Sequence, residues 1–179
     1  MVLDTPLCLY FVNSYGVNMI KDRHETLTRI RAVADYQLGR GAGEALFPNR
    51  VKVVFSKRTG RIRHIYLGAK LLATLRPKDG MFSLTLAGAK RLLNGIDPPR
   101  LWVKVPKDVG CFIAEGKSVF AKHVVAADVE IRPEEEVTVI NEDGRLLAVG
   151  RAILTGREML AFKRGVAVKV RRGVGSAGG

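Results

Sequence analysis

Short connections between strand-like segments constrain the fold of this chain most strongly. Four runs of apolar and β-branched residues follow one another closely, at 51–55, 61–66, 71–75 and 81–86. Two of the connections, 56–60 and 76–80, have turn compositions and end in glycine. A parallel crossover needs a dozen or more residues, so the chain has no room for one here. The sequence therefore predicts an antiparallel meander.

A helix is predicted ahead of these strands. Asp22, with Glu25 three residues later, has the pattern of an N-cap and its reciprocal partner. Apolar residues then recur at helical spacing, at Leu27, Ile30, Ala34 and Leu38. Gly39 is expected to end this helix, and a second helix is expected at 87–94. A helix laid on an antiparallel sheet forms an α+β layer pair.

The second half of the chain is strand-rich. Asp97-Pro98-Pro99 marks a linker. Beyond it, strands are expected at 101–105, 119–124, 127–131, 136–140, 146–152 and 165–170, and short helices at 108–114 and 157–163. Short strands at this spacing, with a hairpin turn at 141–144, are typical of a small barrel. We expect domains at 1–99 and 100–173, and a disordered tail at 174–179.

Positive charge is concentrated in the first half. The chain has 30 Lys and Arg against 17 Asp and Glu, a net charge of +13. Residues 1–99 hold sixteen of these cations and seven of the acids, and residues 45–78 hold nine cations and no acid. Such an excess usually indicates a polyanionic partner, most often nucleic acid. The alternative is a generally basic surface without a specific partner.

Several classes of protein are excluded. No apolar run approaches the roughly 18 residues that span a bilayer. The segment Leu7–Val12 is predicted as a strand, and it is too short and too poor in preceding basic residues for a signal peptide. Cys8 and Cys111 are far apart, which excludes a disulfide framework and a CxxC zinc site. This cysteine usage fits a reduced, cytoplasmic compartment.

The sequence contains no recognisable catalytic constellation. The nearest candidates, Asp35 beside Tyr36 and Ser118 near His123, form neither a triad nor a carboxylate dyad. Gly116-Lys117-Ser118 reads like the end of a phosphate-binding loop, but Cys111 stands where that motif needs a glycine. The histidines do not pair at metal-ligand spacing; they are His24, His64 and His123. We therefore expect no catalytic residue, no metal site and no cofactor.

Successive parts of the chain resemble two known families. Residues 101–172 resemble a PUA domain, the pseudo-barrel of RNA-modifying enzymes and ribosome-assembly factors, in the stretches 109–124, 127–128, 137–144, 148–152 and 164–170. Residues 20–99 are similar to the pre-PUA domain of archaeal tRNA-guanine transglycosylase, through 31–43, 58–63 and 72–80. The resemblance implies a cystatin-like α+β domain, with a helix on an antiparallel sheet, followed by a small β pseudo-barrel.

The same resemblance limits the function that it implies. The transglycosylase has a large catalytic barrel with a nucleophilic aspartate and a zinc site, for which this chain has no room. Only the RNA-docking role carries over. The resemblance also implies an archaeal source, and one Gln and five Asn among 179 residues are typical of a thermophile.

The PUA resemblance implies two RNA-contacting segments, the helix-to-strand loop and the last strand. The candidate residues are Gly116, Lys117, Ser118, Phe120, Lys122, His123, Arg164, Gly165, Lys169, Arg171 and Arg172. Glycine lets a backbone approach a phosphate, and the cations contact phosphates. Phe120 could stack on a base, although a ring of this kind is more often buried. Lys169 and Arg171 alternate with valines and are expected to face away from the core, where a solubilising edge strand is the alternative.

A third candidate cluster lies in the acid-free tract. Arg58, Arg61 and Arg63 are suited to phosphate contact, and a solvated face is the alternative. The acidic runs 134–136 and 142–143 are expected at solvated turns that keep RNA away from that edge.

These residues favour a non-catalytic RNA-binding module, with tRNA as the first candidate. Such a module could be a docking subunit for a tRNA-modifying enzyme, such as an archaeosine-forming transglycosylase. The alternative is a ribosome-assembly factor that binds rRNA and protein partners. An exposed apolar patch on the N-terminal sheet, or at the segment Leu7–Val12, would favour that role. A small RNA-modifying enzyme ranks last, because no catalytic constellation is present.

Overall fold

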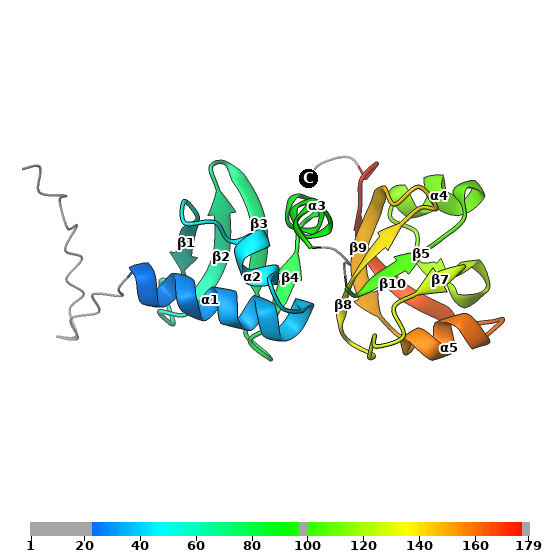
Figure 1. Ribbon diagram of the computed structural model, residues 1–179, viewed down its shortest axis with the longest axis horizontal. Helices are drawn as coiled ribbons and strands as arrows, with labels where there is room; N and C mark the ends of the chain where they lie inside the picture. Colours follow the sequence, from blue (N-terminus) through cyan, green and yellow to red (C-terminus); the bar gives the residue numbers. More distant parts are fainter. Residues whose placement is uncertain (1–22, 97–99, 177–179) are drawn as a thin grey trace, which may run out of the picture.

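The computed structural model describes residues 23–96 and 100–176, which form two halves placed side by side (Figure 1). The elements of the N-terminal half are α1 (Arg23–Leu38), α2 (Ala42–Leu46), β1 (Lys52–Phe55), β2 (Ile62–Leu67), β3 (Lys70–Leu75), β4 (Phe82–Leu84) and α3 (Leu86–Gly95). Its strands lie in the order β1-β2-β3-β4 and all pair antiparallel, so the predicted meander is confirmed. The predictions for Leu7–Val12, Asp22 and the linker at 97–99 lie outside the described residues.

Helix α1 buries the apolar stripe that its sequence predicts. Ile30, Ala34 and Leu38 are buried against the sheet, and Leu27 is half-buried. The side chain of Gln37 fixes the helix to β4, because its amide donates to the Phe82 carbonyl at 2.9 Å and its oxygen accepts from the Phe82 N–H at 2.6 Å. This bidentate contact sets how α1 lies across the end of the sheet.

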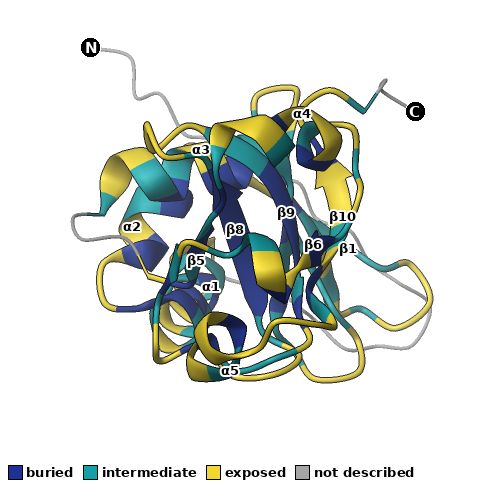
Figure 2. Cartoon of the chain, turned by 90° about the vertical axis from the view of Figure 1, so that its right-hand side faces the viewer, coloured by how far each residue is buried: buried dark blue, intermediate teal, exposed yellow. Residues whose placement is uncertain are grey.

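The second half is a curled six-stranded sheet. Its elements are β5 (Trp102–Lys104), α4 (Lys107–Ala114), β6 (Val119–Phe120), the 3-10 turn η1 (Ala121–His123), β7 (Ala126–Ala127), β8 (Glu136–Ile140), β9 (Leu146–Ala152), α5 (Gly156–Ala161) and β10 (Val166–Gly173). The strand order is β6-β10-β9-β8-β5-β7, and only the β5–β8 pair is parallel. Figure 2 shows β8 and β9 buried at the centre, with the more exposed helices α4 and α5 around them.

Two strands are shorter than the sequence predicts. The strand expected at 127–131 ends at Ala127, because the carboxylate of Asp128 accepts hydrogen bonds from the N–H groups of Leu101 (2.9 Å) and Glu130 (3.0 Å) and turns the chain. The strand expected at 119–124 ends at Phe120 and continues as η1. A side-chain hydrogen bond ends β7, and cross-strand pairing ends β6. Apolar periodicity in the sequence reports neither kind of contact.

The beginning of the expected disordered tail is instead held against α4. The N–H of Val174 donates to the Leu147 carbonyl at 2.9 Å, and that of Gly175 donates to the Ala114 carbonyl at 2.8 Å. The hydroxyl of Ser176 donates to the Gly173 carbonyl at 2.7 Å. Ordered backbone therefore extends to residue 176, and residues 177–179 lie outside the described part of the chain.

One buried carboxylate joins the two halves. Glu136 is 1% exposed, and its Oε1 accepts the Leu84 N–H at the end of β4 at 2.9 Å. The guanidinium of Arg171 forms an ion pair with both Glu136 oxygens and donates to the Leu84 carbonyl. These three residues are called the interdomain clamp below.

The clamp corrects one expectation, for Glu136, and bears out another, for Arg171. Glu136 belongs to an acidic run expected at a solvated turn, yet it is buried because the N-terminal half covers the outer face of β8. Arg171 has the outward orientation that it was expected to share with Lys169. Both residues are exposed, and Glu136, with which Arg171 pairs, lies in one cross-strand row with Arg151 and Lys169. The register of β10 against β9 shifts between Val170 and Arg172, so Arg171 and Arg172 are exposed in succession.

Candidate nucleic-acid interface

The structure brings the two candidate segments of the second half together. Strand β6 pairs with β10, with Phe120 opposite Val166 and Val119 opposite Val168. One residue further, the N–H of Ala121 donates to the Gly165 carbonyl at 3.0 Å. Residues 116–123 and 164–169 therefore lie beside each other, and they are called the loop–strand surface below.

Backbone hydrogen bonds fix the loop that follows α4. The N–H of Gly116 donates to the Ile113 carbonyl at 2.9 Å, and that of Lys117 donates to the Phe112 carbonyl at 3.0 Å. Gly116 has φ +101°, a left-handed conformation that glycine adopts without strain. The chain thus leaves the helix sharply and presents the exposed Lys117 at its corner, with Ser118 half-buried behind it.

Alternating burial along β6 and β10 separates core from surface. Val119, Ala121 and Val168 are buried, whereas Phe120 is 47% exposed. The expectation that this ring is usually a core residue is therefore wrong here: the strand alternation turns it to the outer face. His123 is half-buried at the end of η1.

Four cations of the loop–strand surface are exposed and free of carboxylates. They are Lys117, Lys122, Arg164 and Lys169. Within the described ranges, none of them takes part in an ion pair. Their neighbour Gly165 has φ +96° and open space around its α-carbon, so the backbone at the start of β10 can be approached closely. This arrangement suits a polyanion.

The candidates Arg171 and Arg172, near the end of β10, have surroundings that differ from those of the four free cations. Arg171 is held in the interdomain clamp. Arg172 is exposed and lies opposite Val149 of β9. Lys169, by contrast, lies opposite Arg151, whose guanidinium is 2.8 Å from the Glu134 carboxylate.

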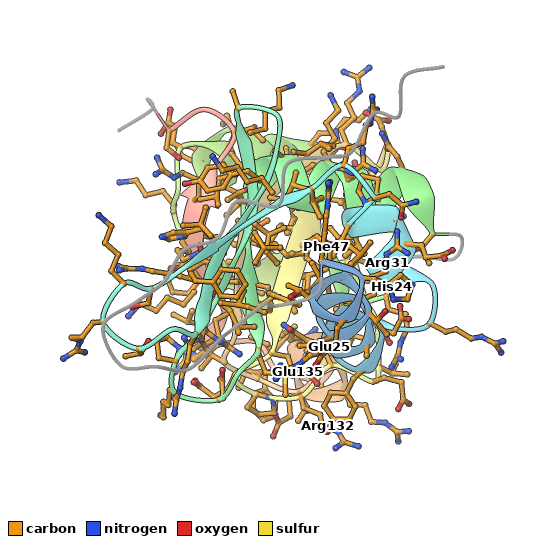
Figure 3. All side chains as sticks on the ribbon, turned by 90° about the vertical axis from the view of Figure 1, so that its left-hand side faces the viewer. His24, Glu25, Arg31, Phe47, Arg132 and Glu135 are labelled. Atoms are coloured by element: carbon orange, nitrogen blue, oxygen red, sulfur yellow. The ribbon has the colours of Figure 1, made fainter. Side chains whose placement is uncertain are left out.

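The arginine cluster of the N-terminal half lies apart from this surface. Arg58 is in the turn between β1 and β2, and Arg61 and Arg63 are at the start of β2; all three are exposed. These are the strands of the sheet farthest from the second half (Figure 1). Figure 3, viewed from this end, shows nitrogen-tipped side chains extending outward around the N-terminal half.

The sequence reasoning missed two exposed residues beside Arg164. Phe162 is 46% exposed and follows the end of α5, and Lys163 is exposed next to it. The sequence signal was present, because Phe162-Lys163-Arg164 is an aromatic-basic run directly before a glycine. Residues of this type serve single-stranded RNA binding through stacking and charge.

A capping box holds the helix that carries this run. The Thr155 hydroxyl accepts the Glu158 N–H at 3.2 Å, and the Glu158 carboxylate accepts the Thr155 N–H at 2.8 Å. The backbone hydrogen bond from Thr155, and then its hydroxyl, lower the pKa of Glu158. A carboxyl with a lowered pKa in the folded state stabilises the protein above its unfolded pKa and loses that effect as pH falls.

We expect Thr155→Ala to lower the free energy of unfolding by about 1 kcal/mol at neutral pH, because one N-terminal donor of α5 loses its acceptor. The difference from the wild type should narrow in acidic buffer, where Glu158 is protonated in both chains. Urea unfolding of the wild type and the variant, at neutral and at acidic pH, measures this difference in the free energy of unfolding. A difference that is the same in acid would contradict the coupling between Thr155 and Glu158.

The described residues also limit other functions. No helix among residues 23–96 and 100–176 is long and apolar enough to cross a membrane. Over the same residues, no group of three or more His, Cys, Asp or Glu is placed to hold a metal ion.

Comparison with known proteins assigns the second half. The family model of the PUA domain matches residues 102–174, the stretch that forms the curled sheet. The chain contains a PUA domain. The model for the patch-forming domain C2 of tRNA-guanine transglycosylase matches residues 28–99, which are most of the described N-terminal half.

Relatives and solved structures agree with this assignment. The tRNA-guanine(15) transglycosylase of Methanobrevibacter smithii is 44% identical over 166 residues, which are 93% of this chain and 25% of that protein. A solved hypothetical protein from Pyrococcus horikoshii is 25% identical with a TM-score of 0.68, over 85% of this chain and 92% of its own. A conserved PUA domain protein from Thermoplasma acidophilum is 21% identical with a TM-score of 0.60, over 86% and 91%.

These comparisons confirm the predicted fold, a helix-and-sheet domain followed by a PUA half-barrel. They also confirm the resemblance to the C-terminal region of archaeal tRNA-guanine transglycosylase. The chain spans about a quarter of the length of the curated relatives that it matches.

Proposed function

We propose that this chain is a non-catalytic RNA-binding module that docks a tRNA for a separate tRNA-modifying enzyme, such as an archaeosine-forming transglycosylase. The observation that carries the proposal is the loop–strand surface of the PUA domain, whose two paired segments carry four unpaired exposed cations and the exposed ring of Phe120. The similarity to tRNA-guanine(15) transglycosylases supports tRNA as the RNA.

The loop–strand surface suits the end of an RNA duplex. The major groove of A-form RNA is too narrow for side chains, so phosphates, 2′-hydroxyls and unpaired bases are the accessible features. Lys117, Lys122 and Lys169 would contact phosphates, and the backbone at Gly116 and Gly165 allows close approach. Phe120, which is exposed on the same surface, would stack on an unpaired base next to the duplex.

The N-terminal half would add a second set of phosphate contacts through Arg58, Arg61 and Arg63. The interdomain clamp supports this reading, because it fixes how the two halves are placed relative to each other. Two basic surfaces held at a fixed separation can bind one RNA without an additional ordering cost.

The binding of four nucleic acids tests the proposal. Fluorescence anisotropy would follow an unmodified tRNA transcript, the same transcript without its unpaired acceptor end, an rRNA hairpin and a DNA duplex, from low to high salt. We expect the full tRNA to bind most tightly, and each phosphate contact to steepen the log–log salt slope by roughly 0.7 to 0.9. Equal, steeply salt-dependent binding of all four would indicate only a generic basic surface.

Two other outcomes would point to the alternative functions. Preference for the rRNA hairpin would favour a ribosome-assembly role. That role was expected to show an exposed apolar patch on the N-terminal sheet or at Leu7–Val12. Within residues 23–96 the one strongly exposed large hydrophobic side chain is Tyr36, on α1, and Leu7–Val12 lies outside the described residues. Modification of a tRNA nucleoside by the pure chain alone would overturn the non-catalytic reading.

A further inference from the structure

A groove of about 810 Å³ lies between the two hairpin turns of the N-terminal sheet. One wall is the β1–β2 turn, the other is the β3–β4 turn, and the floor is formed by the strands between them. The cations that line it are Lys57, Arg58, Arg61, Arg63 and Arg76, and no Asp or Glu is among its lining residues. It is called the turn groove below.

The floor of the turn groove has no Asp, Glu, Lys or Arg side chain among the residues that pair across it. Val54, His64 and Thr74 lie opposite one another across β1, β2 and β3, and all three are half-buried. The Nδ1 atom of His64 lies 3.3 Å from the Thr74 hydroxyl oxygen, which leaves Nε2 for another partner. The ring also meets Tyr66 edge to face, with centroids 6.2 Å apart. The imidazole is therefore held in place on the sheet.

The walls carry the charge. Arg76 is ion-paired to Asp79 at 2.9 Å, within its own turn. Within the described residues, no ion pair engages Lys57, Arg58, Arg61 or Arg63. The charge that is free for a ligand thus comes from the β1–β2 turn and the start of β2.

This distribution suits a polyanion that also has an uncharged planar part. A free phosphate could accept from the rim cations and from Thr74 or His64, but it would leave the planar face of the His64 ring and the side chain of Val54 without a contact. The phosphate ridges of an RNA duplex could reach the exposed arginines but not the half-buried floor, because bases in a duplex are stacked and paired. An unpaired nucleotide can place its phosphates at the rim and its base at the floor.

We propose that the turn groove binds an unpaired nucleotide of the RNA, with His64 contacting the base and the β1–β2 cations contacting the flanking phosphates. This inference rests on the proposed function, because it takes RNA as the partner. It adds a second, base-dependent contact, on the N-terminal half and separate from the loop–strand surface.

Three labelled RNAs of about twelve nucleotides test it with the full chain, since sites for single strands span about 4–16 nucleotides. They are a single strand, the same strand with abasic nucleotides, and a blunt duplex. We expect His64→Ala to weaken binding of the single strand about ten-fold and to leave the other two unchanged, because the phosphate contacts are intact. The control is His24→Ala, because His24 is an exposed residue of α1 that is not among the residues lining the turn groove (Figure 3).

A second variant keeps the test independent of the histidine. Val54→Phe fills the floor with a residue that favours strands, and we expect it to weaken single-strand binding in the same way. Equal affinity of the wild type for base-bearing and abasic strands would overturn the inference. The inference would also be overturned if His64→Ala weakened the binding of all three RNAs by the same factor. Both results would leave tRNA docking by the PUA domain standing, whereas failure to bind the tRNA transcript would overturn the proposed function as well.

Discussion

Replacing Glu136 by alanine should lower the free energy of unfolding by about 2–3 kcal/mol, because its buried hydrogen bonds are lost while Arg171, whose side chain is 41% exposed, can still be hydrated. Two groups lose their partner at once, the Arg171 guanidinium and the Leu84 N–H, and the packing around the carboxylate is lost as well. Because these groups belong to both halves, the variant should also uncouple the halves. We expect urea unfolding to change from one transition to two.

The matched control is Glu134→Ala. Glu134 also pairs with an arginine across the strand, at 2.8 Å from Arg151, but its side chain is 68% exposed. Surface pairs of this kind contribute about 0–1 kcal/mol. If Glu136→Ala and Glu134→Ala lowered the free energy of unfolding by similar amounts, a special role for the clamp would be contradicted. A double variant, Glu136→Leu with Arg171→Met, should recover part of the loss, because no charge is then left without its partner.

The second large effect concerns RNA affinity. Replacing the four free cations of the loop–strand surface with alanine should weaken tRNA binding about a thousand-fold near 0.1 M salt. The residues are Lys117, Lys122, Arg164 and Lys169. The log–log salt slope should also fall by about three to four, since each lost phosphate contact removes nearly one unit. Anisotropy titrations at several salt concentrations give both quantities.

A control with the same loss of charge separates local contacts from overall charge. Lys90, Lys107, Arg132 and Arg145 are exposed and lie outside the loop–strand surface. We expect their replacement by alanine to change the slope by less than about one. Equal effects of the two quadruple variants would contradict a localised binding surface and would support a diffuse attraction.

Much of the fold could be predicted from the sequence because local signals decide it. Turns at 56–60 and 76–80 left only an antiparallel meander, and Ile30, Ala34 and Leu38 marked the buried face of α1. The ends of the strands near 121 and 128 could not be predicted in this way. They depend on a backbone pairing with Gly165 and on the side chain of Asp128, which are tertiary contacts.

Part of the candidate site could also be predicted from the sequence, and part could not. The juxtaposition of residues 116–123 with 164–169 came from the PUA resemblance and is present in the structure. The pairing of Arg171 with Glu136 could not be predicted, because it joins two strands that are 35 positions apart in the sequence and is a tertiary contact. The burial of Glu136 was hidden for a similar reason: a glutamate reads as a surface residue until another part of the chain covers it.

The most direct test of the docking account is a crosslinking map. A photoreactive phenylalanine analogue placed at Phe120, bound to tRNA and irradiated, would report the contacted nucleotides by primer extension. The account predicts crosslinks confined to the unpaired acceptor end and the adjoining base pairs, and far fewer from the same analogue at Tyr36, which is more exposed, at 80% against 47%. Crosslinks spread along the whole tRNA, or equal yields from the two positions, would contradict it.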